Sequence, residues 1–539
     1  MQQSLFQFDD QTLSIEDIAS DLGASEASVR NWIKTGYLLV DDRKKITKES
    51  FFHFKREIVG SEKLIKRANK QFVSSARTAK GSEPDNPNSV CPSKNYENSL
   101  TAAFKNKEGI FYTPDYIADQ FFADLPTDRQ SLTFLDPCCG TGNFLLAAIR
   151  NGFLPQNVYG FDTDSRAIAI AQSRLSPFYG FPSANVKHRD FLRDKNDAED
   201  WPAKFDVVIT NPPWGKKLPK IEREALGRRL GAGKSIDTCS LFFFAALECL
   251  KHAGYCGFLL PDSFFNVGAF EAARQRALSL KIVTISDFGK AFVGLLTNAV
   301  GITVRNNTAS EPNEARCRVL RNGAPHFLRQ DQFSSNPNAI FNFRCTDEEA
   351  KTIDHALSLP HATLKGQAQW GLGIVTGNNA RFVKDHPVTG HMPVWKGSDI
   401  GHGSLKPPST YIPEDLSLYQ QVAPLKIYNS PEKLIYKFIS NRLVFFHDVE
   451  QRRILNSANA MIPESHFNFS QEYLCKYLNS RVINWIFRSI FATHKVLRSD
   501  LECLPLFLDF MERGVSFCDE DLCRHLGIKE AGNGTFRIA

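Results

Sequence analysis

The 539-residue sequence contains no arrangement of cysteines that indicates a metal site or a disulfide framework. Its 12 cysteines are scattered, and none forms a CxxC pair or lies near a histidine pair at the spacing of zinc ligands. We therefore expect no bound metal and a reducing compartment, the cytoplasm.

A secretion signal and a long apolar run are also absent. The first 17 residues hold no basic region followed by an apolar core, and the most apolar short run, residues 239–250, is interrupted by Glu248. A membrane-spanning helix needs about 20 apolar residues. We expect neither export nor a membrane span.

Two sequence patterns of nucleotide chemistry are missing as well. The stretch Gly-Arg-Arg-Leu-Gly-Ala-Gly-Lys-Ser has five residues between Gly227 and Gly233, one too many for a phosphate-binding P-loop. No PD-(D/E)xK nuclease pattern occurs in the first hundred residues, so we do not expect a fused nuclease.

The chain does contain enough apolar sequence, 42% of its residues, for about three domains of roughly 150 residues each. Its net charge of +6 is concentrated, because residues 41–80 carry 12 Lys and Arg against 5 Asp and Glu. Such a segment is either a solvated helix face or a nucleic-acid contact, and the sequence leaves both open.

The first part of the chain has the pattern of two short helices. Residues 14–34 predict one helix, a turn at Gly23 and a second helix that Ser25 caps. Apolar residues recur there at helical spacing: Ile15, Ile18, Ala19, Leu22, Val29, Trp32 and Ile33.

This pattern, together with the stretch at 44–55, resembles the helix-turn-helix of MerR and excisionase regulators. The resemblance implies that the second helix, with Arg30, Asn31 and Lys34 on its polar side, enters the major groove of DNA. We expect a small helical domain over residues 1–80. Hairpins of this shape also pack without contacting DNA, so both uses stay open.

The rest of the chain divides into further regions. Residues 78–99 are rich in Pro, Ser and Asn, which indicates a linker, placed at 81–104. Strands are predicted at 132–136, 157–162, 205–210 and 255–261, with helices beginning at Asn143 and Ser165 and a third over 240–252. This alternation over 105–345 predicts an α/β fold, doubly wound around a largely parallel sheet. Beyond it we expect a mixed α+β domain at 346–510 and a C-terminal extension at 511–539.

A glycine turn follows the first of these strands and opens a helix. Gly140 and Gly142 let the backbone approach a ligand closely, as in a dinucleotide-binding fold. Two residues disagree with that fold: Leu145 stands where its third glycine would be, and the carboxylate of Asp136 would repel a pyrophosphate. A cofactor with a cationic amino group suits Asp136 better.

Two more acids follow the next two strands. Asp162 ends the strand at 157–162, where a carboxylate can accept hydrogen bonds from both hydroxyls of a ribose. Asp190 is placed to accept one from an adenine amino group. Each acid alone is typical of a helix cap or a turn, but their order after successive strands favours the joint interpretation. Upstream, the turn at 112–114 precedes a helix and is placed to close over one end of the cofactor.

The sequence Asn211-Pro212-Pro213-Trp214 follows the strand at 205–210. Its prolines fix an extended loop and contribute no N–H group of their own. The N6 amine of adenine is a poor nucleophile because its lone pair is delocalised into the ring. The Asn211 side-chain oxygen and the Pro212 carbonyl can accept both amine hydrogens and return that lone pair to nitrogen. Trp214 offers a flat face to a purine that has left its duplex; the alternative is a proline-rich turn with a buried tryptophan.

In this order the segments FYTP, DPCCGTGNF, FDTD, RDF and NPPW resemble the gamma class of N6-adenine DNA methyltransferases, the Taq-type group, over residues 109–305. The resemblance implies a class I methyltransferase fold and methyl transfer from S-adenosylmethionine to a flipped adenine in double-stranded DNA. Residues implied to bind the cofactor are Tyr112, Thr113, Pro114, Asp136, Gly140, Gly142, Asp162 and Asp190. Residues implied to act on the base are Asn211, Pro212, Pro213 and Trp214, the last standing where the family often has Tyr or Phe. Because a methyl sulfonium is already activated, in-line transfer needs neither a metal nor a general base.

The family also has an aromatic residue on the far face of the flipped base. Phe292 occupies that place, with Phe288 as a neighbouring alternative, and either also fits a plain core position. Segments 370–382, 478–487 and 495–506 are similar to the family's target-recognition domain. The resemblance implies the modification enzyme of a restriction-modification system, monomeric in solution, whose partners are duplex DNA and a separately encoded restriction endonuclease.

Two other classes stay open at this point. The NPPW loop and its fold also resemble enzymes that methylate a protein glutamine amide or a guanine amine in ribosomal RNA, which usually lack a large downstream recognition domain. A DNA-binding regulator with a degenerate methyltransferase fold is the non-enzyme alternative. The intact Asn211 and Asp136 argue against such decay.

Overall fold

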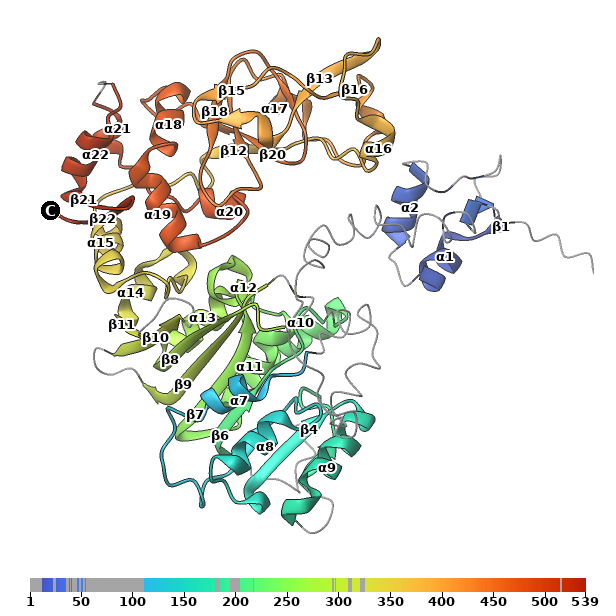
Figure 1. Cartoon of the computed structure of the whole chain (residues 1–539). Helices are drawn as coiled ribbons and strands as arrows, with labels where there is room; N and C mark the ends of the chain where they lie inside the picture. Colours follow the sequence, from blue (N-terminus) through green and yellow to red (C-terminus); the bar gives the residue numbers. More distant parts are fainter. Residues whose placement is uncertain are drawn as a thin grey trace, which may run out of the picture. The chain divides into compact units, whose positions relative to one another are not determined.

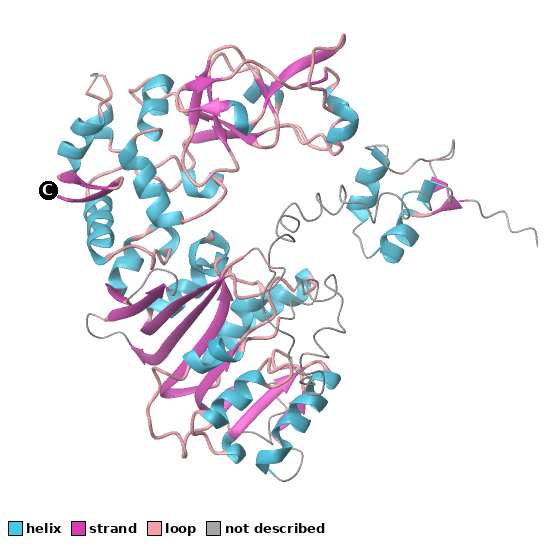
Figure 2. Cartoon of the chain, in the orientation of Figure 1, coloured by secondary structure: helices cyan, strands magenta, loops and turns pink. Residues whose placement is uncertain are grey.

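The computed structural model describes residues 111–539, except 180–184, 194–203, 217, 293–294, 296, 309–312, 320–324 and 514–515, together with parts of 12–54. Contacts divide the chain into two units (Figures 1 and 2). The α/β unit groups residues 79–359, 489–492 and 528–539; the mixed unit groups residues 1–78, 360–488 and 493–527. Each is described by itself.

A nine-stranded sheet forms the centre of the α/β unit, in the order β11-β10-β8-β9-β7-β6-β3-β4-β5. The strands are β3 (Phe134–Asp136), β4 (Val158–Asp162), β5 (Val186–His188), β6 (Phe205–Thr210), β7 (Leu250–Pro261), β8 (Leu280–Gly289), β9 (Ala299–Thr308), β10 (Glu314–Val319) and β11 (His326–Arg329). β3 to β7 pair in parallel, whereas β9 is antiparallel to both β7 and β8. The predicted doubly wound, largely parallel sheet is confirmed.

Helices cover both faces of this sheet. In chain order the helices of this unit are α7 (Asp115–Gln120), α8 (Asn143–Arg150), α9 (Ser165–Tyr179), α10 (Lys220–Arg229), α11 (Thr238–Glu248), α12 (Ser263–Asn266), α13 (Glu271–Leu278), α14 (Gln330–Ser335) and α15 (Asp347–Ser358). Successive β7 residues face opposite layers, because Gly257 meets Phe121 after α7 and Phe258 packs on Phe243 of α11. Figure 1 accordingly shows α7 in front of the sheet and α11 behind it.

Two boundaries differ from the sequence prediction. The helix expected over 240–252 ends at Glu248, because β7 already begins at Leu250, which pairs with Phe205 of β6. The α/β unit extends beyond residue 345 to include α15, which packs against the C-terminal hairpin of β21 (Ile528–Gly532) and β22 (Thr535–Ile538). The two segments are far apart in the sequence, so the local pattern of strands and helices near residue 345 does not predict this contact.

Small sheets and helices form the mixed unit. One sheet has the order β12-β20-β17-β18 and is antiparallel, whereas a second has the order β16-β13-β19 and is mixed, because β13 pairs antiparallel with β16 and parallel with β19. Its strands are β12 (Ala368–Leu372), β13 (His391–Trp395), β14 (Ile400–Gly401), β15 (Ser404–Leu405), β16 (Tyr411–Pro413), β17 (Lys433–Lys437), β18 (Phe445–Asp448), β19 (Arg453–Ile454) and β20 (Ala458–Pro463). The helices are α16 (Asn379–Phe382), α17 (Leu425–Tyr428), α18 (Gln471–Leu478), α19 (Arg481–Phe491), α20 (Arg498–Leu501), α21 (Leu508–Met511) and α22 (Asp519–Leu526). No helix in the described ranges combines the length and apolarity that crossing a membrane requires.

The N-terminal segment has a core of its own. It contains α1 (Ile15–Leu22), α2 (Glu26–Lys34) and a pairing of β1 (Thr12–Leu13) with β2 (Ile46–Thr47). The buried residues are Ile18, Ala19, Val29, Leu38, Ile46, Phe51 and Phe54. Gly23, Ser25, the side chains of Asn31 and Lys34, and the linker at 81–104 lie outside the described residues.

A buried ion pair joins β17 to β18 in the mixed unit. Lys433 and Asp448 stand opposite each other, and Lys433 Nζ lies 2.6 Å from Asp448 Oδ2 with both side chains fully buried. Arg452 Nη1 lies 2.8 Å from Asp448 Oδ1. Burial opposes ionisation of Asp448, but hydrogen bonds and charge from Lys433 and Arg452 lower its pKa below the usual value.

We expect Asp448→Ala to lower the free energy of unfolding by about 3–5 kcal/mol, because it leaves the Lys433 charge buried without an anionic partner, beside the neutral carbonyl of Tyr428. Urea unfolding measures the loss. Because the pKa of Asp448 is lowered, the wild-type contribution is present at neutral pH and is lost only as the pH falls below about 4. Lys476→Ala, which removes an exposed pair with Glu472, is the control and costs less than about 1 kcal/mol. Equal losses in the two variants would contradict this account.

Candidate active site

The glycine turn after β3 has the backbone shape that the sequence predicts. Gly140 has φ +50° and Gly142 has φ +88°, both in the left-handed region that favours glycine. A Cβ atom on Gly140 would lie 3.4 Å from Cε1 of Tyr112, so the Tyr112 ring lies directly over the turn. Gly142 precedes α8, and a Cβ atom on it would lie 3.2 Å from Ala171 Cβ of α9, so the absence of a side chain lets the turn approach α9 closely.

Asp136 ends β3 with its side chain almost fully buried, at 1% exposure. Its Oδ1 accepts hydrogen bonds from Thr210 Oγ1 at 2.7 Å and from the Cys138 amide at 3.1 Å. Burial raises the pKa of Asp136 to about 7, with a further contribution from the charge of Asp162. A cationic ligand beside such a carboxyl group favours its ionised form, and the resulting pair of opposite charges stabilises the bound state.

Asp162 and Asp190 follow β4 and β5, but both carboxylates already accept hydrogen bonds from the protein. Asp162 accepts the amide of Gly140 at Oδ2 and the amide of Asp164 at Oδ1, each at 2.9 Å. Burial raises the pKa of Asp162. Asp190 Oδ1 accepts the amides of the next turn, and its Oδ2 lies 3.3 Å from Arg193 Nη1. Both acids therefore make the turn contacts that the sequence offered as the alternative to ligand binding. Their carboxylate oxygens still retain lone pairs that can accept hydrogen bonds from a ligand.

The segment at 111–114 is tied to the glycine turn by a residue of α8. Asn143 Nδ2 donates to the carbonyl of Thr113 at 2.7 Å, and Asn143 Oδ1 accepts from Arg174 of α9 at 2.6 Å. Arg174 also donates to the carbonyl of Thr141 at 2.6 Å. Thr113 is buried and Pro114 precedes α7. Sequence analysis found Asn143 only as a helix start and gave no signal for Arg174, which looks like any cation on a surface helix.

The side-chain amide of Asn211 is hydrogen-bonded at its nitrogen, whereas its oxygen has no partner among the described residues. Its Nδ2 donates to the carbonyl of Phe111 at 2.8 Å, whereas its buried Oδ1 has no hydrogen-bond partner among the described residues. The reverse amide orientation would set two acceptors against each other, so the contact with Phe111 fixes Oδ1 as the free acceptor. An unsatisfied buried acceptor costs about 1–3 kcal/mol and calls for a functional reason.

Three aromatic rings gather beside Asn211. Trp214 is edge-on to Phe292, with ring centroids 5.2 Å apart, and Phe111 lies 6.2 Å from Trp214 and 5.7 Å from Phe292. Trp214 Nε1 donates to the carbonyl of Leu259 in β7 at 3.1 Å. Pro212 is buried, and Pro213 accepts a weak hydrogen bond from Cys239 Sγ at 3.8 Å. Sequence analysis did not single out Phe111, although it begins the FYTP segment.

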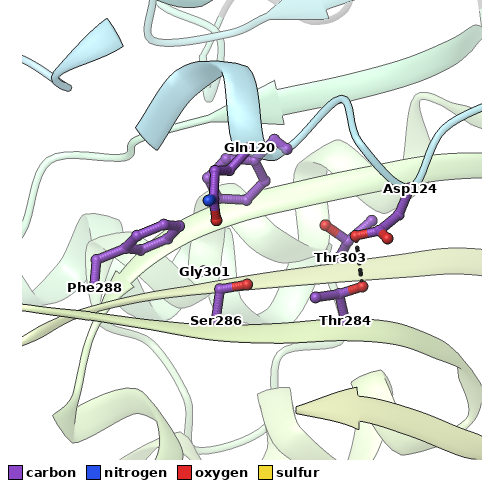
Figure 3. A pocket seen from close by; sticks show the side chains of 8 residues that line it. Gln120, Asp124, Thr284, Ser286, Phe288, Gly301 and Thr303 are labelled. Atoms are coloured by element: carbon purple, nitrogen blue, oxygen red, sulfur yellow. Dashed lines mark hydrogen bonds between the residues drawn. The ribbon is translucent and has the colours of Figure 1, made fainter. Parts of the chain in front are cut away.

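Phe288, the alternative to Phe292, lies elsewhere. Its ring packs on Phe121 at 6.2 Å, and it lines a cavity of about 10 Å³, enough for one water molecule. Figure 3 shows Phe288 directed toward Gln120, with the hydrogen bond between Thr284 and Asp124 on the far side of the cavity. Phe288 is therefore part of the core between α7 and the sheet.

The described ranges contain no group of three or more His, Cys, Asp or Glu side chains arranged to hold a metal ion. The thiols of Cys138, Cys139 and Cys239 lie near the turn, and burial raises the pKa of each well above its usual value. Burial therefore favours the neutral thiol of each at physiological pH.

The strand order and the glycine turn define the chain as a protein with the class I methyltransferase fold. Residues 156–293 match the family described as Eco57I restriction-modification methylase, and residues 392–506 match the TaqI-like C-terminal specificity domain. The type II methyltransferase M.VspI of Vibrio sp. (strain 343) is 47% identical over 407 residues, which cover 74% of this chain and 98% of that protein. This chain belongs to the family of type II restriction-modification methyltransferases.

More distant proteins share parts of the chain. The modification methylase CviBIII of Paramecium bursaria Chlorella virus NC1A is 23% identical over 234 residues, covering 43% of this chain and 58% of that protein. The solved structure of the type IIL restriction-modification enzyme MmeI in complex with DNA aligns with a TM-score of 0.52 and 13% identity, covering 76% of this chain and 70% of that one. At this identity the likeness to MmeI shows a shared fold.

The raised pKa of Asp136 predicts a pH-dependent affinity for a cationic cofactor. Below about pH 7 Asp136 is protonated and loses its charge, so binding of S-adenosylmethionine weakens by up to about tenfold per pH unit. Calorimetric titration between pH 5.5 and 7.5 measures the slope. Asp136→Asn binds more weakly at pH 7.5 and shows no slope; a wild-type affinity that does not change over this range would refute the assignment.

Proposed function

We propose that this protein is a gamma-class DNA methyltransferase that transfers a methyl group from S-adenosylmethionine to N6 of a specific adenine in duplex DNA. The observation that carries this proposal is the buried Oδ1 of Asn211, which has no partner among the described residues while Nδ2 is committed to Phe111. An exocyclic amine is the kind of donor that this acceptor lacks.

The acceptor loop supplies the chemistry at the amine. Asn211 Oδ1 and the Pro212 carbonyl each accept one N6 hydrogen, which shifts the nitrogen lone pair out of the ring and toward the incoming methyl group. When bound, S-adenosylmethionine supplies an activated methyl sulfonium. The loop then acts by positioning and by charge complementarity, so no side chain has to remove a proton before transfer.

The burial of Asn211 Oδ1 requires the target base to leave its helix. A stacked adenine cannot place N6 against an atom inside the protein, so the base is extruded. Trp214 and Phe292 are buried and packed edge-on against each other beside Phe111, and we expect these three rings to supply the apolar faces that an extruded purine needs. Family membership supports DNA as the substrate and a separately encoded restriction endonuclease as the biological partner.

The residues around the glycine turn fit S-adenosylmethionine. Gly140 and Gly142 leave room for close backbone approach, and Asp136 presents a buried carboxyl group to the cationic amino group. Asp162 would accept the ribose hydroxyls, and Asp190 the adenine amine. The segment Tyr112, Thr113 and Pro114 would close over the methionine end, since the Tyr112 ring already lies over Gly140.

We assign the remaining regions by the same reasoning. Residues 105–345 hold every proposed cofactor and catalytic residue, and residues 346–510 would choose the DNA sequence, supported by the match of 392–506 to a specificity domain. Residues 1–80 would form an accessory DNA-binding unit of the helix-turn-helix kind, supported by the separate core of α1 and α2.

Replacing Asn211 by Ala should lower the rate of methyl transfer by about 100-fold or more, because it removes a hydrogen-bond acceptor that acts on the reacting amine. Affinity for S-adenosylmethionine should stay within a few-fold, since Asn211 contacts the base. Single-turnover transfer and calorimetric titration measure the two quantities. Asn313→Ala is the matched control, because Asn313 is a part-buried amide on the sheet that binds Ile282 and Gln330. The catalytic assignment fails if both variants keep the wild-type rate.

Deleting residues 1–80 should leave cofactor affinity, the methylated sequence and the maximal rate unchanged, because every proposed site residue lies beyond residue 110. If the unit lengthens the footprint on substrate DNA, the KM for DNA rises. If it instead binds a separate regulatory sequence, the kinetics stay the same and binding to that sequence is lost. Steady-state kinetics and sequencing of methylated DNA decide between the two uses; a changed target sequence or lost cofactor binding would show that the unit is integral to the enzyme.

A further inference from the structure

We propose that Arg344 is a positioning residue for methyl transfer, because it clamps both ends of the loop that carries Phe292. The inference rests on the proposed function, in which Phe292 faces the extruded base. It concerns a residue outside every family motif, located between the sheet and α15.

The loop between β8 and β9 covers residues 290–298, of which the structure describes 290–292, 295, 297 and 298, and an aspartate holds each of its two ends. Asp287 Oδ1 accepts the amide of Gly289, which has φ +62° and ends β8. At the other end the Asp262 amide donates to the carbonyl of Asn298, directly before β9. Phe292 lies three residues after Gly289, so its place depends on where these two ends are held.

Arg344 joins the two aspartates. Its Nε lies 2.8 Å from Asp287 Oδ2, and its Nη2 lies 2.9 Å from Asp262 Oδ1. The three side chains are 28%, 10% and 19% exposed, respectively. Asp287 belongs to β8, and Asp262 directly follows β7, and these strands do not pair with each other because β9 lies between them. The planar guanidinium therefore directly links two strand ends that the sheet joins only through Ala299 of β9.

The segment that carries Arg344 is itself fixed. Arg274 of α13 is fully buried and donates to the carbonyls of Asn338, Ala339, Phe264 and Val267. Phe343 packs on Phe265 at 5.4 Å, and the Arg344 guanidinium lies 4.6 Å from the Phe343 ring centroid. Burial alone would lower the pKa of Arg344, yet the two carboxylates raise it, so the clamp is fully charged at neutral pH.

This arrangement sets the spacing of the two aromatic residues. Trp214 is anchored to the carbonyl of Leu259 in β7, whereas Phe292 follows β8. Holding the ends of β7 and β8 together holds Trp214 and Phe292 at a defined separation. A displacement of about 1 Å in such a site can lower the reaction rate by about 100-fold.

Arg344→Met tests the clamp, with Arg318→Met as the matched control. Arg318 forms a comparable part-buried ion pair with Asp124, at 14% and 13% exposure, in β10 of the same unit. We expect Arg344→Met to increase hydrogen exchange in residues 290–298 and to lower single-turnover transfer of labelled methyl groups by up to about 100-fold. Affinity for S-adenosylmethionine and the fall in Tm should match those of Arg318→Met, which leaves loop exchange and rate near wild type.

Two further variants separate positioning from stability. Arg344→Lys keeps the charge but cannot reach both carboxylates, so it should restore Tm more than it restores the rate. Asp287→Asn combined with Arg344→Met should be no slower than Arg344→Met alone, since Arg344→Met has already removed the ion pair with Asp287.

The proposal is overturned if loop exchange in Arg344→Met equals that of the control, or if exchange rises while the rate stays within twofold of the control. The rate counts all methyl groups transferred, so it does not depend on which base accepts them. If the wild-type protein transfers methyl groups to another base, the proposed function fails. The comparison of hydrogen exchange and rate between the variants still decides whether Arg344 is a positioning residue.

Discussion

The hydrogen bond from Thr210 Oγ1 to Asp136 Oδ1 joins the two halves of the proposed active site. Asp136 ends β3 beside the glycine turn, and Thr210 ends β6 one residue before Asn211. The two strands are parallel neighbours, so their carboxyl ends meet at one edge of the sheet, where ligands bind in folds of this kind. A single contact of 2.7 Å thus fixes the distance between the proposed cofactor site and the acceptor loop.

Hydrogen bonds to backbone carbonyls likewise hold three side chains around the acceptor loop. Asn211 is oriented by the carbonyl of Phe111, Trp214 by that of Leu259, and Asn143 by that of Thr113. Each side chain is held by an atom whose place depends on the fold and not on another side chain. The rigidity that methyl transfer needs is therefore built from β7 and the segment before α7. Asn211 Oδ1 remains an acceptor without a partner among the described residues, which is a cost that bound substrate would remove.

Local patterns were sufficient to predict much of this arrangement. The glycine turn, the acids after successive strands and the NPPW loop are contiguous in sequence, and the structure places Asp136, Gly140, Asp162 and Asn211 at one edge of the sheet. Residues that act across long separations were missed. Arg174 contacts Asn143 over 31 positions, Phe111 contacts Asn211 over 100, and Arg344 contacts Asp262 over 82. A single sequence carries no signal for such pairs, because an arginine in a helix or an irregular segment is compatible with any surface. The packing of α15 on the C-terminal hairpin could not be predicted either, because these segments also lie far apart in the sequence.

The chemical identity of the methylated product tests whether this chain acts, as we propose, on N6 of adenine in duplex DNA. Duplex DNA is incubated with the protein and S-adenosylmethionine that carries a deuterated methyl group, and the nucleosides released by digestion are analysed by mass spectrometry. The account predicts the deuterated methyl group in N6-methyldeoxyadenosine. Label in a methylated cytosine, in RNA or in a protein glutamine, or no label at all, would contradict it.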